Sequence, residues 1–267
     1  MPNRRNHERL KTRAGRWLRF VSAPAVLLAA WEALALADYV NPLFFPPPSR
    51  LALEAVRMAA SGELGAQIGA TLHRTVAAFL AGSLAGLACG IVMGGFRWLH
   101  EALEPLIAAV YATPKLTLLP ILMLILGVNE AARVAVPALS CFLLLAIHGF
   151  DAVRSIQKDY VELAKNYGLT RLMRLRRVYL PAAVPQVFTG IRLAFGQALV
   201  LTISVEIVSS DSGLGNMIWT AWQTFSTEQL YIGVFAAAAL GIASLVGLRR
   251  LERKLAPWHE PHAEGIL

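Results

Sequence analysis

The stretch TVAAFLAGSLAGLACGIVMGGF, residues 75–96, decides the fold class because it has no charged residue over 22 positions. A helix needs about 20 mainly apolar residues to cross a bilayer. Gly82, Gly86, Gly90 and Gly94 follow one another at intervals of four, so a helix carries them as one ridge without side chains. Helices in lipid associate through such close backbone packing. The stretch therefore predicts a transmembrane helix that packs against a neighbour in a bundle.

Five more apolar runs accompany this stretch, and the chain is 56% hydrophobic and only 16% charged, with a mean hydropathy of +0.53. A soluble domain carries about a quarter charged residues. We therefore predict an all-α membrane protein with about six transmembrane helices within residues 20–248. Thr113-Pro114-Lys115 and Pro120 interrupt the third run and predict a broken or kinked helix there. The other five runs are 20–37, 106–127, 134–150, 184–208 and 230–248.

The distribution of basic residues predicts the orientation. With the N-terminus inside, the inner segments hold nineteen Lys and Arg and the outer segments hold three, as the positive-inside rule requires. We expect a cytoplasmic basic arm (1–19), a cytoplasmic loop (151–185) and a cytoplasmic tail (249–267). This clustering between apolar runs also argues against reading the net charge of +8 as a nucleic-acid interface. A cleaved signal peptide over residues 1–37 is the alternative, disfavoured by Trp31 and Glu32 in its apolar run.

The first outer connection, 41–49, contains four prolines and predicts an extended strap, followed by a helix with Ser49 as N-cap. Cys89 and Cys141 both lie in apolar runs and are expected to be core thiols, not disulfide partners.

Ionisable residues inside apolar runs are candidates for function because burying them in hydrocarbon costs free energy. Lys115 and Arg192 lie near the inner ends of their runs, and we expect both to reach the headgroups. Lys115 is also a candidate for the lining of a translocation pathway. Glu206 lies near an outer end and should face a bundle interior or a wet cavity, either lining a pathway or making a structural hydrogen bond. Because Ser212 and Gly213 follow it in a polar turn, we expect this segment to line the mouth of a pathway.

The loop 151–185 contains a short amphipathic helix. Tyr160, Leu163, Ala164 and Tyr167 fall on one helical face, and Gly168 follows as a stop signal. A basic segment comes next, and we expect Leu180-Pro181 to close it. The residues alone leave two uses open: the helix rests on anionic lipid, or it fits a groove on a partner protein.

The run Glu162-Leu163-Ala164-Lys165-Asn166-Tyr167-Gly168, followed nine residues later by Val178-Tyr179-Leu180-Pro181, resembles the EAA motif of ABC importer permeases. That motif is Glu-Ala-Ala, three residues, Gly, nine residues, then Ile-x-Leu-Pro. This chain keeps each spacing and departs only in Leu163 and Val178. The broken 113–120 segment, Gly190-Ile191-Arg192, Ser212-Gly213-Leu214-Gly215 and the ending 251–258 are similar to the nitrate/sulfonate/taurine/bicarbonate branch of these permeases.

The resemblance implies a type I ABC importer permease fold in a bacterial inner membrane. It implies that the loop helix docks on an ATPase subunit through Tyr160, Glu162, Leu163, Ala164, Tyr167 and Gly168. It also implies a second permease copy, two ATPase subunits, and a periplasmic or lipid-anchored solute-binding protein. The transported solute is expected to be a small organic or inorganic anion, with a sulfonate or taurine first, and a thiamine precursor or another aromatic solute as the alternative.

The chain itself has no phosphate-binding loop, since no lysine follows a glycine. We therefore expect no cofactor in this chain, with ATP and magnesium held by the partner ATPase, and no enzymatic activity. His259 and His262 are a weak metal signal on a polar tail, and no metal site is expected. An ion-coupled secondary transporter, with Glu206 and Lys115 as coupling groups, is the competing class; it usually shows inverted repeats, and none is visible in the sequence.

Overall fold

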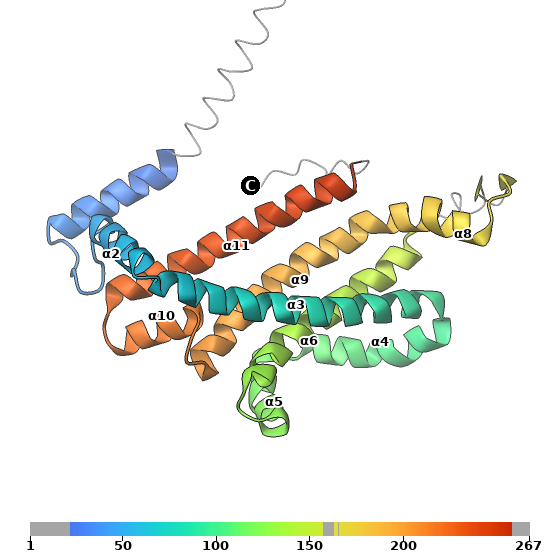
Figure 1. Cartoon of the computed structure of the whole chain (residues 1–267), viewed down its shortest axis with the longest axis horizontal. Coiled ribbons are helices and arrows are strands. Elements are labelled where there is room, and N and C mark those ends of the chain that lie inside the picture. The colour runs from blue at the N-terminus through green and yellow to red at the C-terminus, as the bar shows by residue number, and fades with distance from the viewer. Residues whose placement is uncertain (1–21, 157–162, 165, 258–267) are drawn as a thin grey trace, which may run out of the picture. The chain divides into compact units, whose positions relative to one another are not determined.

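The computed structural model describes residues 22–156, 163–164 and 166–257, and every regular element among them is helical (Figure 1). A short helix, Ser22–Leu36, comes first. The others are α2 (Pro48–Ala60), α3 (Glu63–Gly95), α4 (Arg97–Ala112), a 3-10 turn (Lys115–Leu118), α5 (Leu119–Leu126), α6 (Glu130–Arg154), α8 (Arg171–Arg174), a π-helical turn (Leu175–Tyr179), α9 (Leu180–Ser209), α10 (Leu214–Gln223) and α11 (Thr227–Leu255).

Four helical segments are long and apolar enough to cross a membrane: α3, α6, the segment Leu172–Ser209 that contains α9, and α11. The bent pair of α4 and Lys115–Leu126, with 98° between its halves, is long and apolar enough to make a fifth when it is counted as one span. The break at Thr113 and Pro114 is therefore confirmed, but Pro120 is not a second break, since it lies in the first turn of α5. The first of the six expected runs begins outside the described residues, and its described part is the shorter helix Ser22–Leu36.

The chain divides into two compact units. One comprises residues 1–64 and 220–232, and the other comprises residues 65–219 and 233–267. The larger unit holds most of each long span and the loop after α6.

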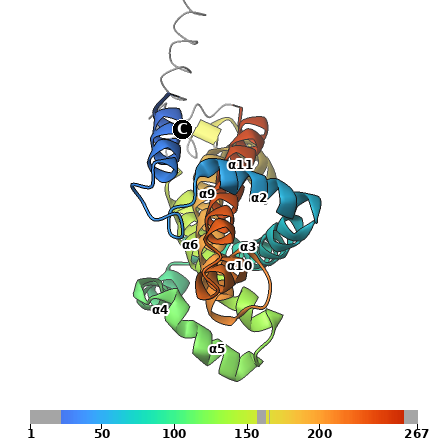
Figure 2. The ribbon, with the colours of Figure 1, turned by 90° about the vertical axis from the view of Figure 1, so that its left-hand side faces the viewer.

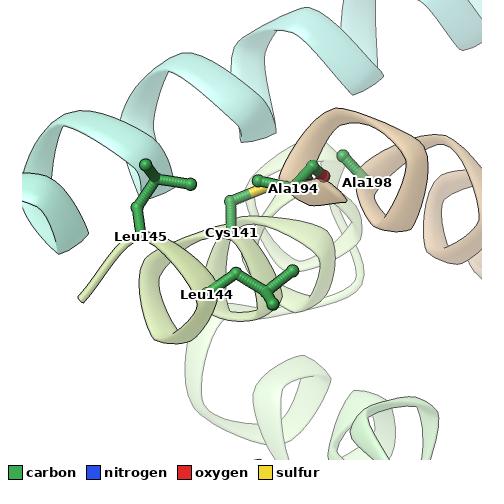
Figure 3. Close-up of a cluster of buried hydrophobic side chains, with 5 residues drawn as sticks. All are labelled: Cys141, Leu144, Leu145, Ala194 and Ala198. Atoms are coloured by element: carbon green, nitrogen blue, oxygen red, sulfur yellow. Dashed lines mark hydrogen bonds between the residues drawn. The ribbon is translucent and has the colours of Figure 1, made fainter. Parts of the chain in front are cut away.

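Within the larger unit, α6 packs against both α3 and α9. Figures 1 and 2 show α6 and α9 side by side, and Figure 3 shows a cluster of buried side chains that these two helices contribute. Cys141 is fully buried, with Sγ 3.4 Å from the carbonyl oxygen of Ala194. Leu119, Val136 and Val205 form a second cluster that attaches α5 to α6 and α9. The bend after α4 is thus held by apolar packing of its second half.

Three local expectations need correction. The first outer connection makes a turn at 42–44, and α2 begins at Pro48 with Pro47 as N-cap. Ser49 instead donates its hydroxyl to Glu32, at 2.6 Å. Leu180-Pro181 does not close the basic segment, because the π-helical turn leads directly into α9 and places Pro181 in the first turn, where its missing N–H is tolerated. Apart from these, α11 continues past residue 248 to Leu255, so its last turns fall in the segment expected as a tail.

Candidate functional site

Glu206 lies in the last turns of α9 and has no exposed surface. Its Oε1 accepts a hydrogen bond from Arg74 Nη1 at 2.8 Å. Its Oε2 accepts from the Thr71 hydroxyl at 2.8 Å and from the Gly215 backbone N–H at 3.0 Å. Each oxygen of this buried carboxylate is therefore paired, which is the condition for keeping a charge away from water.

Arg74 on α3 is the centre of this polar group, and each of its five N–H donors has an acceptor. Nε and Nη2 donate to the two oxygens of Glu130, at 2.8 and 2.9 Å. Nη1 donates to Glu206 and to the carbonyl of Ser212, and Nη2 also donates to the Ser212 hydroxyl. The planar guanidinium suits this bidentate pairing, which an ammonium does not reproduce. We call Thr71, Arg74, Glu130, Glu206 and Ser212 the Arg74 cluster.

The turn after α9 is fitted tightly onto the Arg74 cluster. Gly213 has a φ of +105°, and a Cβ at this residue would lie 2.3 Å from Glu206 Cδ. Its N–H donates to Gln67 Oε1 at 2.6 Å, while the next N–H, of Leu214, donates to the Thr71 hydroxyl at 2.8 Å. A side chain at residue 213 would therefore displace both the turn and Glu206.

Arg133 extends the charged group from α6. Its Nε donates to the Ser209 carbonyl at 2.8 Å, and its Nη1 donates to Glu130 at 2.6 Å and lies 3.4 Å from Asp211. Together, Arg74 and Arg133 join the beginning of α6 to α3 and to the end of α9.

The structure thus brings together three of the four expected pathway residues. Glu206, Ser212 and Gly213 are neighbours, and Glu206 makes the structural hydrogen bonds that were one of its two predicted roles. Lys115 lies elsewhere, on the 3-10 turn after α4, where its Nζ is 4.4 Å from the centre of the Tyr111 ring. That any of these residues lines a pathway stays a prediction.

Sequence reasoning missed Arg74 as the charge partner of Glu206, and Glu130 as the second carboxylate that pairs with Arg74. Arg74 directly precedes the apolar stretch 75–96, and Glu130 falls in the short connection before the fourth run. The sequence did contain a signal for this pairing, because Arg74, Glu130 and Glu206 each lie at the end of an apolar run that is expected on the same side of the membrane. Arg192 donates to Glu252 on α11, a partner that the sequence did not predict, and its reaching the headgroups stays a prediction.

The loop after α6 contains part of the expected amphipathic helix. Leu163, Ala164 and Asn166 are helical, whereas Tyr160 and Glu162 lie outside the described residues. Gly168 has a φ of +70°, and the Leu169 N–H donates to the Ala164 carbonyl at 3.1 Å. This left-handed glycine with a six-to-one hydrogen bond is a Schellman ending, so the predicted stop at Gly168 is confirmed.

The apolar face of this helix is only partly covered. Ala164 is 6% exposed, but Leu163 and Tyr167 are 55% and 77% exposed. An open groove of about 500 Å³ adjoins them, lined by Leu163, Ala164, Tyr167, Leu169, Arg177, Val178, Pro181 and Ala182. Large apolar side chains at the rim of an apolar groove are typical of a surface that binds another protein.

The four spaced glycines of α3 lie directly against α6. A Cβ at Gly82, Gly86 or Gly90 would come within 2.0–2.2 Å of the carbonyl oxygen of Ala138, Phe142 or Ala146, and a Cβ at Gly94 would lie 2.6 Å from Val153 Cβ. The obstacles at the first three are backbone atoms, which cannot move aside as a flexible side chain can. The two helix backbones are therefore closer than any side chain would permit.

Gly86→Ala is expected to destabilise the protein by about 1–3 kcal/mol, the usual range for overpacking a close contact. The measurement is the melting temperature of the purified protein in detergent. Gly69→Ala is the matched control on the same helix, because nothing lies within 4 Å of its Cβ position. Equal melting temperatures for the two variants would contradict close packing at Gly86.

No group of three or more His, Cys, Asp or Glu residues in the described parts of the chain is arranged to hold a metal ion. His259 and His262 lie outside those parts.

Comparisons with known proteins agree on one class. The family model described as "Binding-protein-dependent transport system inner membrane component" matches residues 82–258. The taurine transport system permease protein TauC of Escherichia coli (strain K12) is 28% identical over 240 residues, which is 88% of this chain and 87% of that protein. The riboflavin transport system permease protein RibX of Chloroflexus aurantiacus is 32% identical over 233 residues, covering 87% of each.

A similar fold is found in a solved structure of the MetNI methionine ABC transporter in an inward-facing conformation. The TM-score is 0.61 at 17% identity, over 69% of this chain and 92% of that chain. At this identity the likeness concerns the fold.

Proposed function

The chain belongs to the family of binding-protein-dependent transport system inner membrane components. We propose that it transports a small organic anion, and that taurine or another sulfonate is the first candidate. It is a permease subunit of an ABC importer in the inner membrane, and it works with an ATPase and a binding protein. In this family, ATP hydrolysis belongs to the separate ATPase subunit. The similarity to TauC over 88% of the chain is the observation that supports this choice of solute.

A second candidate solute is a heteroaromatic compound such as riboflavin. The similarity to RibX, at 32% identity, favours it. In an importer that receives its solute from a binding protein, the permease pathway need not recognise every solute group. Permeases of similar sequence can therefore serve chemically different solutes.

The partner set can be proposed in more detail. We infer two permease copies with the pathway between them, two ATPase subunits that bind ATP and magnesium, and a periplasmic or lipid-anchored binding protein. Both chain termini and the loop 151–185 then lie in the cytoplasm, as the basic residues suggest. A purified complex with one permease for every two ATPase subunits would rule out the paired arrangement.

Two regions of the permease have separate roles in this proposal. The helix that ends at Gly168 docks on the ATPase, an assignment supported by the exposed Leu163 and Tyr167. The turn holding Ser212 and Gly213 borders the outer mouth of the pathway. Glu206 holds this turn in place from the protein interior, in keeping with its full burial and its contacts to Arg74 and Gly215.

Uptake by reconstituted vesicles tests the function. Vesicles carrying the permease and its ATPase, supplied with the binding protein, should accumulate labelled taurine when ATP is present on the ATPase side. A complex with a hydrolysis-defective ATPase is the control and should accumulate none. Riboflavin uptake without taurine uptake would support the second candidate. Solute uptake driven by an ion gradient without ATP would contradict both.

A further inference from the structure

We propose that α2 lies at the interface between membrane and water and docks on lipid through an exposed apolar face. The face consists of Ala52, Leu53, Val56, Ala59 and Ala60. This inference concerns a surface outside the transport machinery described above, and it depends only on the chain being a membrane protein.

The residues of α2 form three arcs around the helix axis. Successive residues of a helix turn by about 100°, which puts Leu51 and Met58 on one edge, where both are buried. Arg50, Glu54 and Arg57 lie on a second, polar edge. The proposed face lies between these edges, and it is solvent-exposed: Leu53 is 63% exposed and Val56 is 67% exposed. One apolar edge against protein, one open apolar face and one charged edge are the features of a helix lying in an interface.

A very short connection joins α2 to the next helix. Helix α2 ends at Ala60, and the membrane span α3 begins at Glu63. Gly62, with a φ of +80°, separates them. Only two residues connect α2 to α3, so covalent geometry keeps the end of α2 close to the start of α3. The 33 residues of α3 measure about 50 Å, close to the roughly 40–45 Å of a bilayer with its headgroups, so this start lies at headgroup level. A face exposed at this level meets lipid headgroups and the outer part of the acyl chains.

The unit to which α2 belongs has several exposed aromatic side chains. Aromatic side chains, Trp and Tyr above all, gather at membrane–water interfaces because one end of the ring is apolar and the other polar. In this unit such side chains are exposed on the segments next to α2 in the fold or the chain. They are Tyr39, Phe44, Phe45, Trp222 and Phe225.

The charges of the polar edge indicate which kind of lipid contact to expect. Arg57 pairs with Glu54 at 2.8 Å, and Arg50 lies 3.8 Å from Glu228. Because these four charges cancel, the edge has no net attraction for anionic headgroups. Binding should therefore depend on the apolar face and not on the anionic lipid content, unlike that of a basic amphipathic helix.

Spin labels on α2 test the proposal in the full transporter, reconstituted in vesicles of phosphatidylethanolamine with either low or high phosphatidylglycerol. Labels are attached at Leu53→Cys, Val56→Cys and Arg57→Cys in a background where Cys89 and Cys141 are alanine. Collision with oxygen relative to a water-soluble nickel complex should be several-fold higher at 53 and 56 than at 57. The ratio should be the same in both lipid mixtures.

Three outcomes would overturn the proposal. Equal access of the nickel complex at all three positions would place the face in water. A ratio that rises with phosphatidylglycerol would assign the attachment to charge. Labels at 53 and 56 that lose contact with both reagents only when the binding protein is added would assign the face to that protein. ATP-dependent uptake by each labelled complex verifies that the measured protein is folded.

Discussion

Arg74→Met is expected to reduce the amount of folded permease in the membrane at least tenfold. The substitution keeps an unbranched apolar stem but removes the guanidinium group with its five hydrogen-bond donors. Glu206, which has no exposed surface, then loses its charge partner. Removing one partner of a buried ion pair costs about 3–5 kcal/mol, because the other charge stays buried. A loss of this size is comparable to the whole stability of many domains.

Membrane-fraction immunoblots and size-exclusion chromatography of a fluorescent fusion measure this effect. Arg97→Met is the matched control, since Arg97 is also on a helix and paired with one glutamate, Glu101, but its side chain is 85% exposed. Arg97→Met should retain the normal amount of folded protein. Arg74→Lys should fall between the two, because an ammonium cannot meet all the acceptors of Arg74.

A double variant separates the charge effect from loss of packing. Arg74→Met combined with Glu206→Gln leaves no unpaired buried charge, so it should recover part of the folded protein lost in Arg74→Met. If Glu206→Gln alone leaves the permease folded but stops uptake, Glu206 has a direct part in transport. If no variant of Arg74 or Glu206 changes the amount of folded permease, the Arg74 cluster has no structural importance.

Five of the six apolar runs coincide with helices or a bent helix pair that could cross a membrane, because apolar length is a property of the local sequence. Their ends could not be placed as well. The apolar stretch 75–96 begins twelve residues after α3 begins at Glu63, because Gln67, Thr71 and Arg74 are polar in sequence yet helical and internally paired. A hydropathy pattern cannot distinguish such residues from a solvated connection.

The contacts within the Arg74 cluster could not be predicted from the sequence. Glu206 was identified as an unusual charge in an apolar run, but its partners lie 132 and 135 residues away, at Arg74 and Thr71, and at the Gly215 N–H after the turn. Which charges meet is decided by how α3, α6 and α9 pack. The glycine ridge, by contrast, was predictable because its spacing of four is local, although the sequence did not identify α6 as its neighbour. The bend at Thr113 and Pro114 was equally local.

Leu163→Glu is expected to reduce ATP-dependent uptake at least tenfold while leaving the permease folded. The Leu163 side chain is already 55% exposed, so a charge there costs little within the chain. In the proposed complex, the same side chain enters an apolar groove of the ATPase. Truncating or charging a central apolar residue of an interface costs 2 kcal/mol or more, by the usual scale of hot spots, and about 1.4 kcal/mol is a factor of ten.

Asn166→Glu is the matched control for this variant. It introduces the same charge three residues later in the same short helix, at an exposed position off the apolar face. It should pull down the ATPase and support solute-stimulated hydrolysis like the unchanged protein. If Asn166→Glu is as damaging as Leu163→Glu, the effect comes from charge near the loop and not from docking of the apolar face.

Two further substitutions test the geometry of the docking helix. Ala164→Glu places a carboxylate in the apolar groove beside Leu169 and Pro181, and Gly168→Asp adds a charged side chain where the chain turns away with a φ of +70°. Nothing lies within 4 Å of a Cβ at Gly168, so the permease itself has room for the new side chain, and a loss of function there must come from the strained turn or from the partner. Both variants should release the ATPase or uncouple its hydrolysis from transport in vesicles. Normal pull-down together with normal solute-stimulated hydrolysis in both would show that this helix does not couple the two subunits.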